Sequence, residues 1–214
     1  GDTIFGDGGA DMLFGGDGND TIRGNNDIAS GGVSPTAADD GDDYLSGGAG
    51  NDSLVGDSGH DTLYGDDGDD TLFGDADSTP VAYQGDDHME GGAGTDLMRG
   101  YGGADTLLGG ADNDTLYGEA GDDYLDVGED AVGATSRNTA YGGDGNDTIV
   151  GYLGQENILV GEGGDDTITG EGHVWGDAGN DTLVVRGGYV DVTGQQSVAQ
   201  GGEGDDVIRL PGGG

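Results

Sequence analysis

The sequence predicts an all-β fold, built as a coil of short parallel strands, and three observations lead to this prediction. Residues 47–73 read GGAGNDSLV, GDSGHDTLY and GDDGDDTLF, which are three consecutive copies of one nine-residue unit. Nearly every copy places an aliphatic residue at its eighth position. The rest of the chain consists of further copies and of interruptions between them. Self-similarity at a short fixed period is the signature of a repeat architecture.

Each part of the unit predicts one structural feature. Glycines at the first, second and fourth positions permit positive φ and close backbone approach, so the first six residues predict a tight turn. The sixth residue is an Asp, which places a hard oxygen ligand at the mouth of that turn. The last three residues, such as Ser53–Val55, predict a short strand. Because such a strand turns only one side chain inward, successive units must stack to bury a core. Two units then make one turn of the coil, and the loops form two rows, one along each edge.

The predicted core consists of the residues at the eighth position. In the regular units these are Ile4, Leu13, Ile22, Leu45, Leu54, Leu63, Leu72, Met89, Met98, Leu107, Leu116, Leu125, Ile149, Ile168, Leu183 and Ile208. Four interruptions also end in a strand-like segment with an apolar residue at the equivalent place, namely Ala140, Leu159, Val174 and Ala199. We therefore expect the strand to be kept there and only the turn to differ.

The candidate metal ligands are the sixth-position aspartates. They are Asp2, Asp11, Asp20, Asp43, Asp52, Asp61, Asp70, Asp87, Asp96, Asp105, Asp114, Asp123, Asp147, Asp166, Asp181 and Asp206. Oxygen ligands without nitrogen or sulfur favour Ca²⁺ over softer transition metals.

The unit G-G-x-G-x-D-x-U-x, where U is a large aliphatic residue, resembles the calcium-binding RTX (repeats-in-toxin) nonapeptide of secreted bacterial proteins. The resemblance covers nearly the whole chain, since some fifteen copies occur in phase. It implies a right-handed parallel β-roll in which Ca²⁺ lies between loops of the same edge, one full turn apart. The implied ligands are the Asp carboxylates of both loops and the backbone carbonyls of the glycine-rich turns, including those of Gly47, Gly56, Gly65, Gly91, Gly100, Gly109 and Gly118.

The composition limits which partners the chain can have. With 45 acidic and five basic residues, the formal net charge is −40, and only 31% of the residues are hydrophobic. A chain of this kind is typical of disordered proteins unless its charge is neutralised. The charge excludes direct nucleic-acid binding and disfavours anionic membranes. No apolar run is long enough to span a bilayer, so direct membrane insertion is not expected. The lack of cysteine fits an extracellular bacterial repeat array.

Six interruptions separate the regular blocks, near residues 24–37, 74–81, 127–138, 151–156, 170–173 and 185–197. The aspartates that flank them are 23, 17, 24, 19, 15 and 25 residues apart, values that scatter around the 18 residues of one full turn. We therefore predict that each interruption holds one full turn with a replaced middle loop, giving about eleven turns in total. In the segment 151–156, Glu156 is expected to take the ligand position.

Counting half-turns assigns each loop to an edge. The interruptions from 74–81 onward are predicted on one edge, and the one at 24–37 on the other. The edge opposite the late interruptions should carry an unbroken row formed by Asp52, Asp70, Asp87, Asp105, Asp123, Asp147, Asp166, Asp181 and Asp206. Loops gathered on one face can mark an interaction surface, for neighbouring copies or for cell-surface or polysaccharide ligands. Equally, such an edge can tolerate loops because no partner constrains it.

The sequence predicts no active site within these residues. It contains neither HExxH nor G-x-S-x-G, and the paired carboxylates all belong to repeat turns. The favoured function is a calcium-binding structural or interaction module of a large secreted or cell-surface bacterial protein. The alternative is an accessory region of a secreted protease, lipase or polysaccharide-modifying enzyme. A third reading compares the periodic Thr residues with ice-binding solenoids. Residues 1–214 are expected to be a single β-roll segment of a longer protein.

Overall fold

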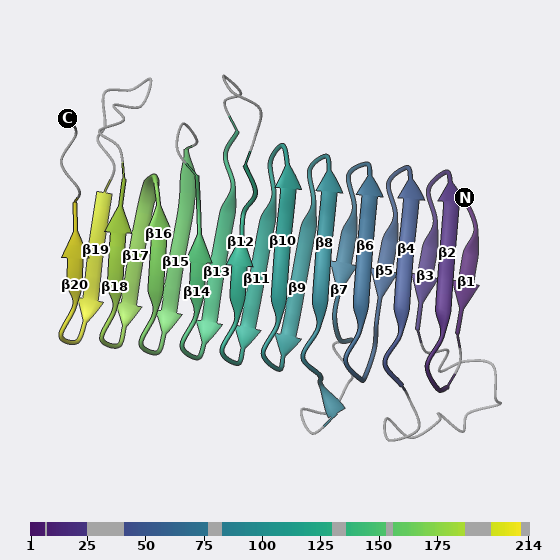
Figure 1. The fold of residues 1–214 in the computed structure, drawn as a ribbon, viewed down its shortest axis with the longest axis horizontal. Helices are drawn as coiled ribbons and strands as arrows, with labels where there is room; N and C mark the ends of the chain where they lie inside the picture. Colours follow the sequence, from purple (N-terminus) through teal and green to yellow (C-terminus); the bar gives the residue numbers. More distant parts are fainter. Residues whose placement is uncertain are drawn as a thin grey trace.

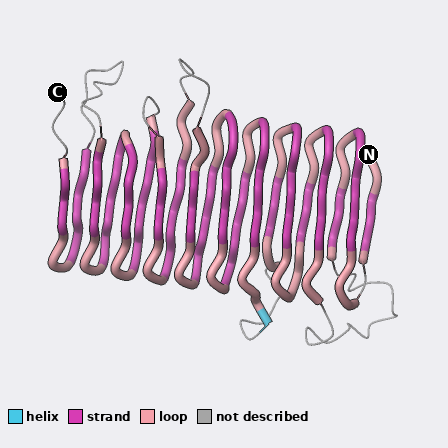
Figure 2. Tube along the Cα trace, in the orientation of Figure 1, coloured by secondary structure: helices cyan, strands magenta, loops and turns pink. Residues whose placement is uncertain are grey.

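Twenty short strands form two parallel sheets of ten strands each in the computed structural model (Figure 1). The structure describes residues 1–6, 8–24, 41–76, 83–129, 136–152, 156–186 and 198–210. Within these ranges the chain alternates between the two sheets, strand after strand, so that strands and turns follow each other along one continuous coil (Figure 2). The predicted all-β parallel coil is confirmed. The described residues contain no helix of the length and apolarity that a membrane crossing needs.

The odd-numbered strands form the first sheet and are adjacent in chain order. They are β1 (Thr3–Phe5), β3 (Thr21–Arg23), β5 (Ser53–Val55), β7 (Thr71–Phe73), β9 (Leu97–Gly102), β11 (Thr115–Ala120), β13 (Thr139–Asp144), β15 (Asn157–Gly163), β17 (Gly172–Ala178) and β19 (Val198–Glu203).

The even-numbered strands form the second sheet in the same manner. They are β2 (Met12–Asp17), β4 (Tyr44–Ala49), β6 (Thr62–Asp67), β8 (His88–Ala93), β10 (Thr106–Ala111), β12 (Tyr124–Asp126), β14 (Thr148–Val150), β16 (Thr167–Gly170), β18 (Thr182–Val185) and β20 (Val207–Arg209).

Neighbouring strands pair equivalent positions of the repeat. Leu63 of β6 lies opposite Leu45 of β4 and Met89 of β8. Many strands are longer than the three residues predicted, because pairing continues into the first half of the next turn, where Asp66 lies opposite Gly92. The strand pairing therefore extends into the loops and fixes the height of one turn above the next.

The core is a single column of side chains between the two sheets. The predicted core residues from Ile22 to Leu183 are fully buried, including Ala140, Leu159 and Val174 of the interrupted turns. Ile4, Leu13 and Ala199 are partly buried against this column. Ile208 is 43% exposed because β20 is the last described strand of its sheet. One inward residue per strand thus suffices for a core only because ten turns stack.

Aromatic side chains form ladders on the outer faces of the sheets. In the even-numbered sheet, Phe14, Tyr44 and Tyr64 follow one another with ring centroids 5.7 and 5.5 Å apart. In the odd-numbered sheet, the rings of Tyr117 and Tyr141 stack with centroids 5.2 Å apart. Cross-strand aromatic pairs of this kind stabilise sheets.

The first two interruptions were assigned wrongly from the sequence. After β3 the chain enters β4 of the opposite sheet, and after β7 it enters β8 of the opposite sheet. The steps from Asp20 to Asp43 and from Asp70 to Asp87 are therefore half-turns that carry extra residues, and neither contains the full turn that we predicted. The described strands accordingly make ten turns of the coil, where about eleven were expected. Residues 25–40 and 77–82 of these interruptions lie outside the described residues.

The two edges of the coil differ, and we name them here. The even-numbered strands begin at the lower edge in Figure 1, and the odd-numbered strands begin at the upper edge. We call the lower edge the continuous edge because its row of aspartates runs from Asp11 to Asp206, and the upper edge the interrupted edge because its row stops at Asp114. The interruptions after β3 and β7 leave from the continuous edge. Those after β12, β14, β16 and β18, near residues 127–138, 151–156, 170–173 and 185–197, leave from the interrupted edge. Residues 130–135, 153–155 and 187–197 lie outside the described residues.

This arrangement corrects part of the edge prediction. The late interruptions share one edge and the interruption at 24–37 lies on the other, as predicted, but the interruption at 74–81 belongs with the early one. Loops therefore leave from both edges, which removes the basis for a one-sided interaction face.

Candidate metal centre

All sixteen candidate aspartates lie at the starts of strands, in one row along each edge. The row on the continuous edge contains Asp11, Asp43, Asp61, Asp87, Asp105, Asp123, Asp147, Asp166, Asp181 and Asp206. The row on the interrupted edge contains Asp2, Asp20, Asp52, Asp70, Asp96 and Asp114. Asp52 and Asp70 were predicted in the same row as Asp87. That assignment is wrong because it depended on the full turn expected at 74–81.

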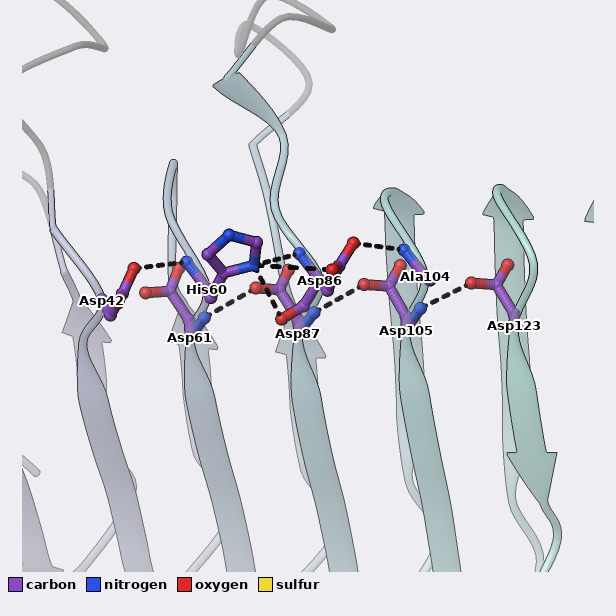
Figure 3. Close-up of polar contacts among 8 residues, drawn as sticks. All are labelled: Asp42, His60, Asp61, Asp86, Asp87, Ala104, Asp105 and Asp123. Carbon is purple, nitrogen blue, oxygen red and sulfur yellow. Dashed lines mark hydrogen bonds and ion pairs between the residues drawn. The ribbon is translucent and has the colours of Figure 1, made fainter.

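A hydrogen bond links each aspartate to the next one in its row. The backbone N–H of Asp87 donates to Oδ1 of Asp105 over 2.8 Å, and that of Asp105 donates to Oδ1 of Asp123 over 2.7 Å (Figure 3). The same bond joins Asp147 to Asp166 and Asp166 to Asp181, although these steps span 19 and 15 residues. The prediction that these pairs are neighbours on one edge is confirmed.

The second carboxylate oxygen of these residues is buried and accepts no hydrogen bond. This holds for Oδ2 of Asp11, Asp20, Asp52, Asp70, Asp87, Asp96, Asp105, Asp123, Asp147, Asp166 and Asp181. A buried polar atom without a partner is costly, and a buried negative charge without a counter-charge is more costly still. A cation beside such a row of oxygens would therefore stabilise the fold.

The first glycine of each unit makes room for this oxygen. A Cβ added to Gly65 would lie 2.5 Å from Oδ2 of Asp70 and 2.5 Å from the carbonyl oxygen of Gly91 in the next turn. Any side chain at Gly65 would thus fill a space into which two oxygen atoms of adjacent turns point. The same arrangement recurs at the other first glycines. The predicted carbonyl ligands of Gly47, Gly56, Gly91, Gly100, Gly109 and Gly118 face the aspartate of the turn before. The ligand roles of these glycines and of Gly65 remain predictions.

Burial changes the acidity of the aspartates. Removal from water, together with nearby carboxylates, raises the pKa of Asp87 to about 10 and that of Asp123 to about 8. Burial likewise raises the pKa of Asp105 and of Asp166 to about 7, against an ordinary value of 3.8. In each case the backbone N–H of the preceding aspartate opposes part of this shift. Without a cation, the folded chain therefore holds protons on several of these groups at neutral pH.

The donor atoms fit a hard cation bound mainly through oxygen. Within the described residues, no three His, Cys, Asp or Glu side chains converge on one point. Neighbouring turns bring one carboxylate each to their shared space, and backbone carbonyls such as that of Gly91 face the same space. Ca²⁺ accepts such mixed sets of carboxylate and carbonyl oxygens, six to eight in number.

The row on the interrupted edge ends at an asparagine. The N–H of Asp114 donates to Oδ1 of Asn138 over 2.7 Å, so Asn138 holds the position that an aspartate holds elsewhere. Its Nδ2 is buried without a partner, where the other turns place a carboxylate oxygen. An amide N–H₂ repels a cation. Asn157 and Gly172 then take the equivalent positions in β15 and β17, so the acidic row on this edge stops after Asp114.

Glu156 does not take the ligand position that the sequence assigned to it. Asn157 directly precedes Ile158 and Leu159, in the place that Asn138 holds one turn earlier. Glu156 instead receives a hydrogen bond over 2.9 Å from the guanidinium of Arg137. The altered turn is longer by one residue than the sequence pattern indicated, which moves Glu156 out of register.

A second row of hydrogen bonds runs beside each row of aspartates and was missed in the sequence. It involves the fifth position of the unit, which is exposed. The N–H of Asn146 donates to Oδ1 of Asp122, that of Asp165 donates to Oδ1 of Asn146, and that of Asn180 donates to Oδ1 of Asp165. His60 joins the same pattern between Asp42 and Asp86 (Figure 3). These bonds run from the later turn to the earlier one, opposite to those of the buried row. The frequent Asn and Asp residues at the fifth position could have predicted this second row of hydrogen bonds from the sequence.

Together, the stacked turns, the rows of buried carboxylates and the carbonyl oxygens facing them define a parallel β-roll whose oxygen atoms are suited to hard cations. Comparison with known families agrees. The chain matches the RTX calcium-binding nonapeptide repeat (4 copies) at residues 1–29, 47–78, 81–107, 99–132, 129–155, 155–183 and 173–189. The chain therefore belongs to the RTX calcium-binding repeat family. No curated protein matched it.

Replacing a buried aspartate should impair calcium binding much more than replacing its exposed neighbour. Asp105→Ala removes a carboxylate that serves the turns of both Asp87 and Asp123, whereas Asp122→Ala removes an exposed acceptor that water can replace. We expect the calcium midpoint of folding to rise roughly tenfold or more for Asp105→Ala, which is about 1.4 kcal/mol or more, and to change little for Asp122→Ala. Calcium titration followed by circular dichroism measures both, and equal midpoints would show that the wrong acid was assigned as the ligand.

Extending the acidic row should extend calcium binding. Asn138→Asp adds a carboxylate above Asp114 in a position that is already buried, so we expect one additional bound Ca²⁺ per chain and a less stable calcium-free fold. Asn113→Asp adds the same charge at an exposed position and serves as the control. Equilibrium dialysis counts the bound ions. An unchanged count for Asn138→Asp would mean that carbonyl ligands, and not this residue, limit the site.

The calcium-free fold should be favoured by acid. Because the folded pKa values of the buried aspartates lie above 3.8, their protonated form contributes stability that is complete below about pH 4 and is lost as the pH rises through about 6 to 10. In buffer stripped of calcium by a chelating resin, the β-signal in circular dichroism should therefore be larger at pH 5 than at pH 8. A signal that grows with pH would contradict the assigned burial. Calcium binding should show the reverse dependence, since protons and Ca²⁺ compete.

Proposed function

We propose that this chain is a calcium-dependent structural module of a secreted or cell-surface protein, which folds when it meets Ca²⁺ outside the cell. The observation that carries the proposal is the continuous row of stacked carboxylates, in which Oδ2 of Asp87, Asp105, Asp123, Asp147, Asp166 and Asp181 is buried and accepts no hydrogen bond. This arrangement fits a fold whose stability depends on a cation. Membership of the RTX calcium-binding repeat family supports calcium as that cation.

Electrostatic repulsion between the carboxylates makes folding depend on calcium. The chain carries a formal charge of −40, and folding stacks the carboxylates of successive turns directly above one another. The core offers only one inward side chain per strand to oppose this repulsion. Bound Ca²⁺ supplies the positive charge and the coordination that join adjacent turns. Binding to the folded state alone then shifts the equilibrium toward folding by mass action.

The known calcium levels on the two sides of a cell membrane suit this behaviour. Extracellular calcium modules typically bind with dissociation constants of roughly 10⁻⁴–10⁻³ M. A chain with sites in this range stays unfolded in the cell interior and folds in the outside medium. The resemblance to secreted RTX proteins, which leave the cell unfolded through a type I secretion channel, supports the same location.

We propose no catalytic role for this segment. Its buried carboxylates are arranged as repeated, equivalent groups along two edges, and their Oδ1 atoms accept hydrogen bonds from the backbone N–H groups of the preceding turns. Catalytic pairs of carboxylates instead need two different environments that separate their pKa values. The alternative, an accessory region of a secreted enzyme, concerns residues beyond this sequence and implies the same calcium-dependent fold.

The proposal predicts a fold that depends on calcium. In chelator at neutral pH the chain should be largely disordered, and it should become rich in β-structure at about 10⁻³ M Ca²⁺. The same concentration of Mg²⁺ should restore little structure, because Mg²⁺ demands octahedral geometry and loses its waters reluctantly. Circular dichroism with EDTA, with Ca²⁺ and with Mg²⁺ tests this. A full β-spectrum in chelator at neutral pH would refute the calcium switch.

A further inference from the structure

The first position of the repeat unit differs between the two edges of the coil. On the continuous edge a glycine holds this position in every described turn, from Gly6 to Gly201. On the interrupted edge glycine holds it from Gly15 to Gly109, but Val127 takes this place after β12, and Val185 takes it at the end of β18. The position that elsewhere leaves room for a carboxylate oxygen therefore carries an apolar side chain in two late turns.

Both valines are buried at the equivalent position of their turns. The carbonyl oxygen of Val127 lies 2.9 Å from where a Cβ of Gly109 would stand, as expected for the first position. Strand pairing places Val185 opposite Gly170, which holds the first position one turn earlier. Val127 is 0% exposed and Val185 is 3% exposed, and both pack in the same core column as the leucines of the repeat. Two late turns thus add buried apolar surface where the early turns have a glycine.

The two glycines between these valines face a methyl group and an amide. A Cβ added to Gly170 would lie 2.5 Å from Cδ1 of Leu159. One added to Gly151 would lie 2.9 Å from the same methyl group and 2.9 Å from Nδ2 of Asn157. At Gly65, in an early turn, the corresponding neighbours are a carboxylate oxygen and a carbonyl oxygen. Protein atoms that do not bind cations therefore fill this space in the late turns of the interrupted edge.

Hydrogen bonds within the protein hold the turn that begins at Gly151. Nδ2 of Asn157 donates to the carbonyl oxygen of Tyr152 over 3.2 Å, and the hydroxyl of Tyr152 donates to Oδ2 of Asp126, in the turn before, over 3.0 Å. Burial and the hydrogen bond to Asp126 raise the pKa of Tyr152 to about 12, so the hydroxyl keeps the proton that it donates. Side chains of the protein therefore join these two turns without an ion.

We name the buried apolar residues Val127, Leu159 and Val185 the apolar seam. We propose that this seam lets the late turns, from β12 to β18, fold at a lower calcium concentration than the early turns, from β2 to β11, so that the chain responds to calcium in two steps. The inference rests on the proposed calcium-dependent folding and adds which turns respond first.

The reason is the number of ions on which each part depends. The early turns stack carboxylates at both edges, and like charges that gather away from water oppose folding. The late turns stack them at one edge, and the seam contributes burial of apolar surface, which needs no ion. Because the early turns take up more calcium on folding, their stability falls faster when calcium is withdrawn.

Hydrogen exchange followed by mass spectrometry, at a series of calcium concentrations, tests this order in the unmodified protein. Peptides from β13 to β18 should become protected at a calcium concentration roughly threefold or more below that which protects peptides from β4 to β9. Protection of both groups at one concentration, or of the early group first, would overturn the proposal and leave calcium-dependent folding intact. Exchange that is independent of calcium in every peptide would refute the calcium-dependent function as well.

A matched pair of variants tests the seam itself. Val185→Gly removes a buried side chain of the seam, whereas Val184→Gly removes the adjacent, half-buried side chain of the same strand. Both changes introduce one glycine into β18 and so carry a similar cost in backbone entropy. Relative to Val184→Gly, Val185→Gly should raise the calcium concentration that protects β13 to β18 roughly threefold or more and should leave the value for β4 to β9 within about twofold. Equal values for the two variants would overturn the role of the seam.

A crystal structure of the unmodified protein grown with Ca²⁺ gives a check that depends on no variant. Calcium should lie along the continuous edge and between the early turns of the interrupted edge. No ion should lie between the turns of Val127, Gly151, Gly170 and Val185, because protein atoms fill that space. A calcium ion bound there would overturn the proposal.

Discussion

The structure depends on bringing buried carboxylates into stacks, one turn above another. Every aspartate after the first of its row accepts a hydrogen bond from the turn before through Oδ1, which aligns the turns, and places Oδ2 in a space that a glycine leaves open. This geometry is unfavourable for the bare chain because like charges gather away from water. It becomes favourable when a cation or protons neutralise them. The feature that makes the metal-free fold unstable is thus the same feature that builds the metal sites.

The two edges of the coil differ in how far their rows of stacked aspartates extend. The continuous edge repeats its aspartate in all ten turns, whereas the acidic row of the interrupted edge stops at Asp114 and gives way to Asn138 and Asn157. Beyond that point, additional buried apolar residues such as Val160 and Val185 contribute to the core. The early turns therefore stack carboxylates at both edges, whereas the late turns stack them at one edge and bury additional apolar side chains.

Insertions affect the loops and leave the strands in place. After β7 the chain departs from the repeat before Asp87, yet β8 resumes in register with β6, and Asp87 takes its place between Asp61 and Asp105. Extra residues in a loop add only slowly to the entropy of closing it, so the stack tolerates them. The turn that carries this insertion also buries an acid, Asp75, at the position that Asp57 holds one turn earlier.

The sequence by itself determined the strands, the core and the two rows of acids, because these follow from local rules. An aliphatic residue at the eighth position of each nine-residue unit and an Asp two residues before it can be identified without any knowledge of distant contacts, and Leu63, Leu107 and Asp105 are buried as predicted. Only the tertiary structure decided which edge each turn occupies. A 17-residue step fits a full turn of 18 residues almost as well as a half-turn of nine with eight added, and the sequence contains nothing that separates the two. Strand pairing in the folded coil decides between them, because Met89 lies opposite Leu63 of β6 and Leu72 of β7 lies opposite Met98. The same dependence on stacking placed Asn157, and not Glu156, at the start of β15 and left Asp75 buried.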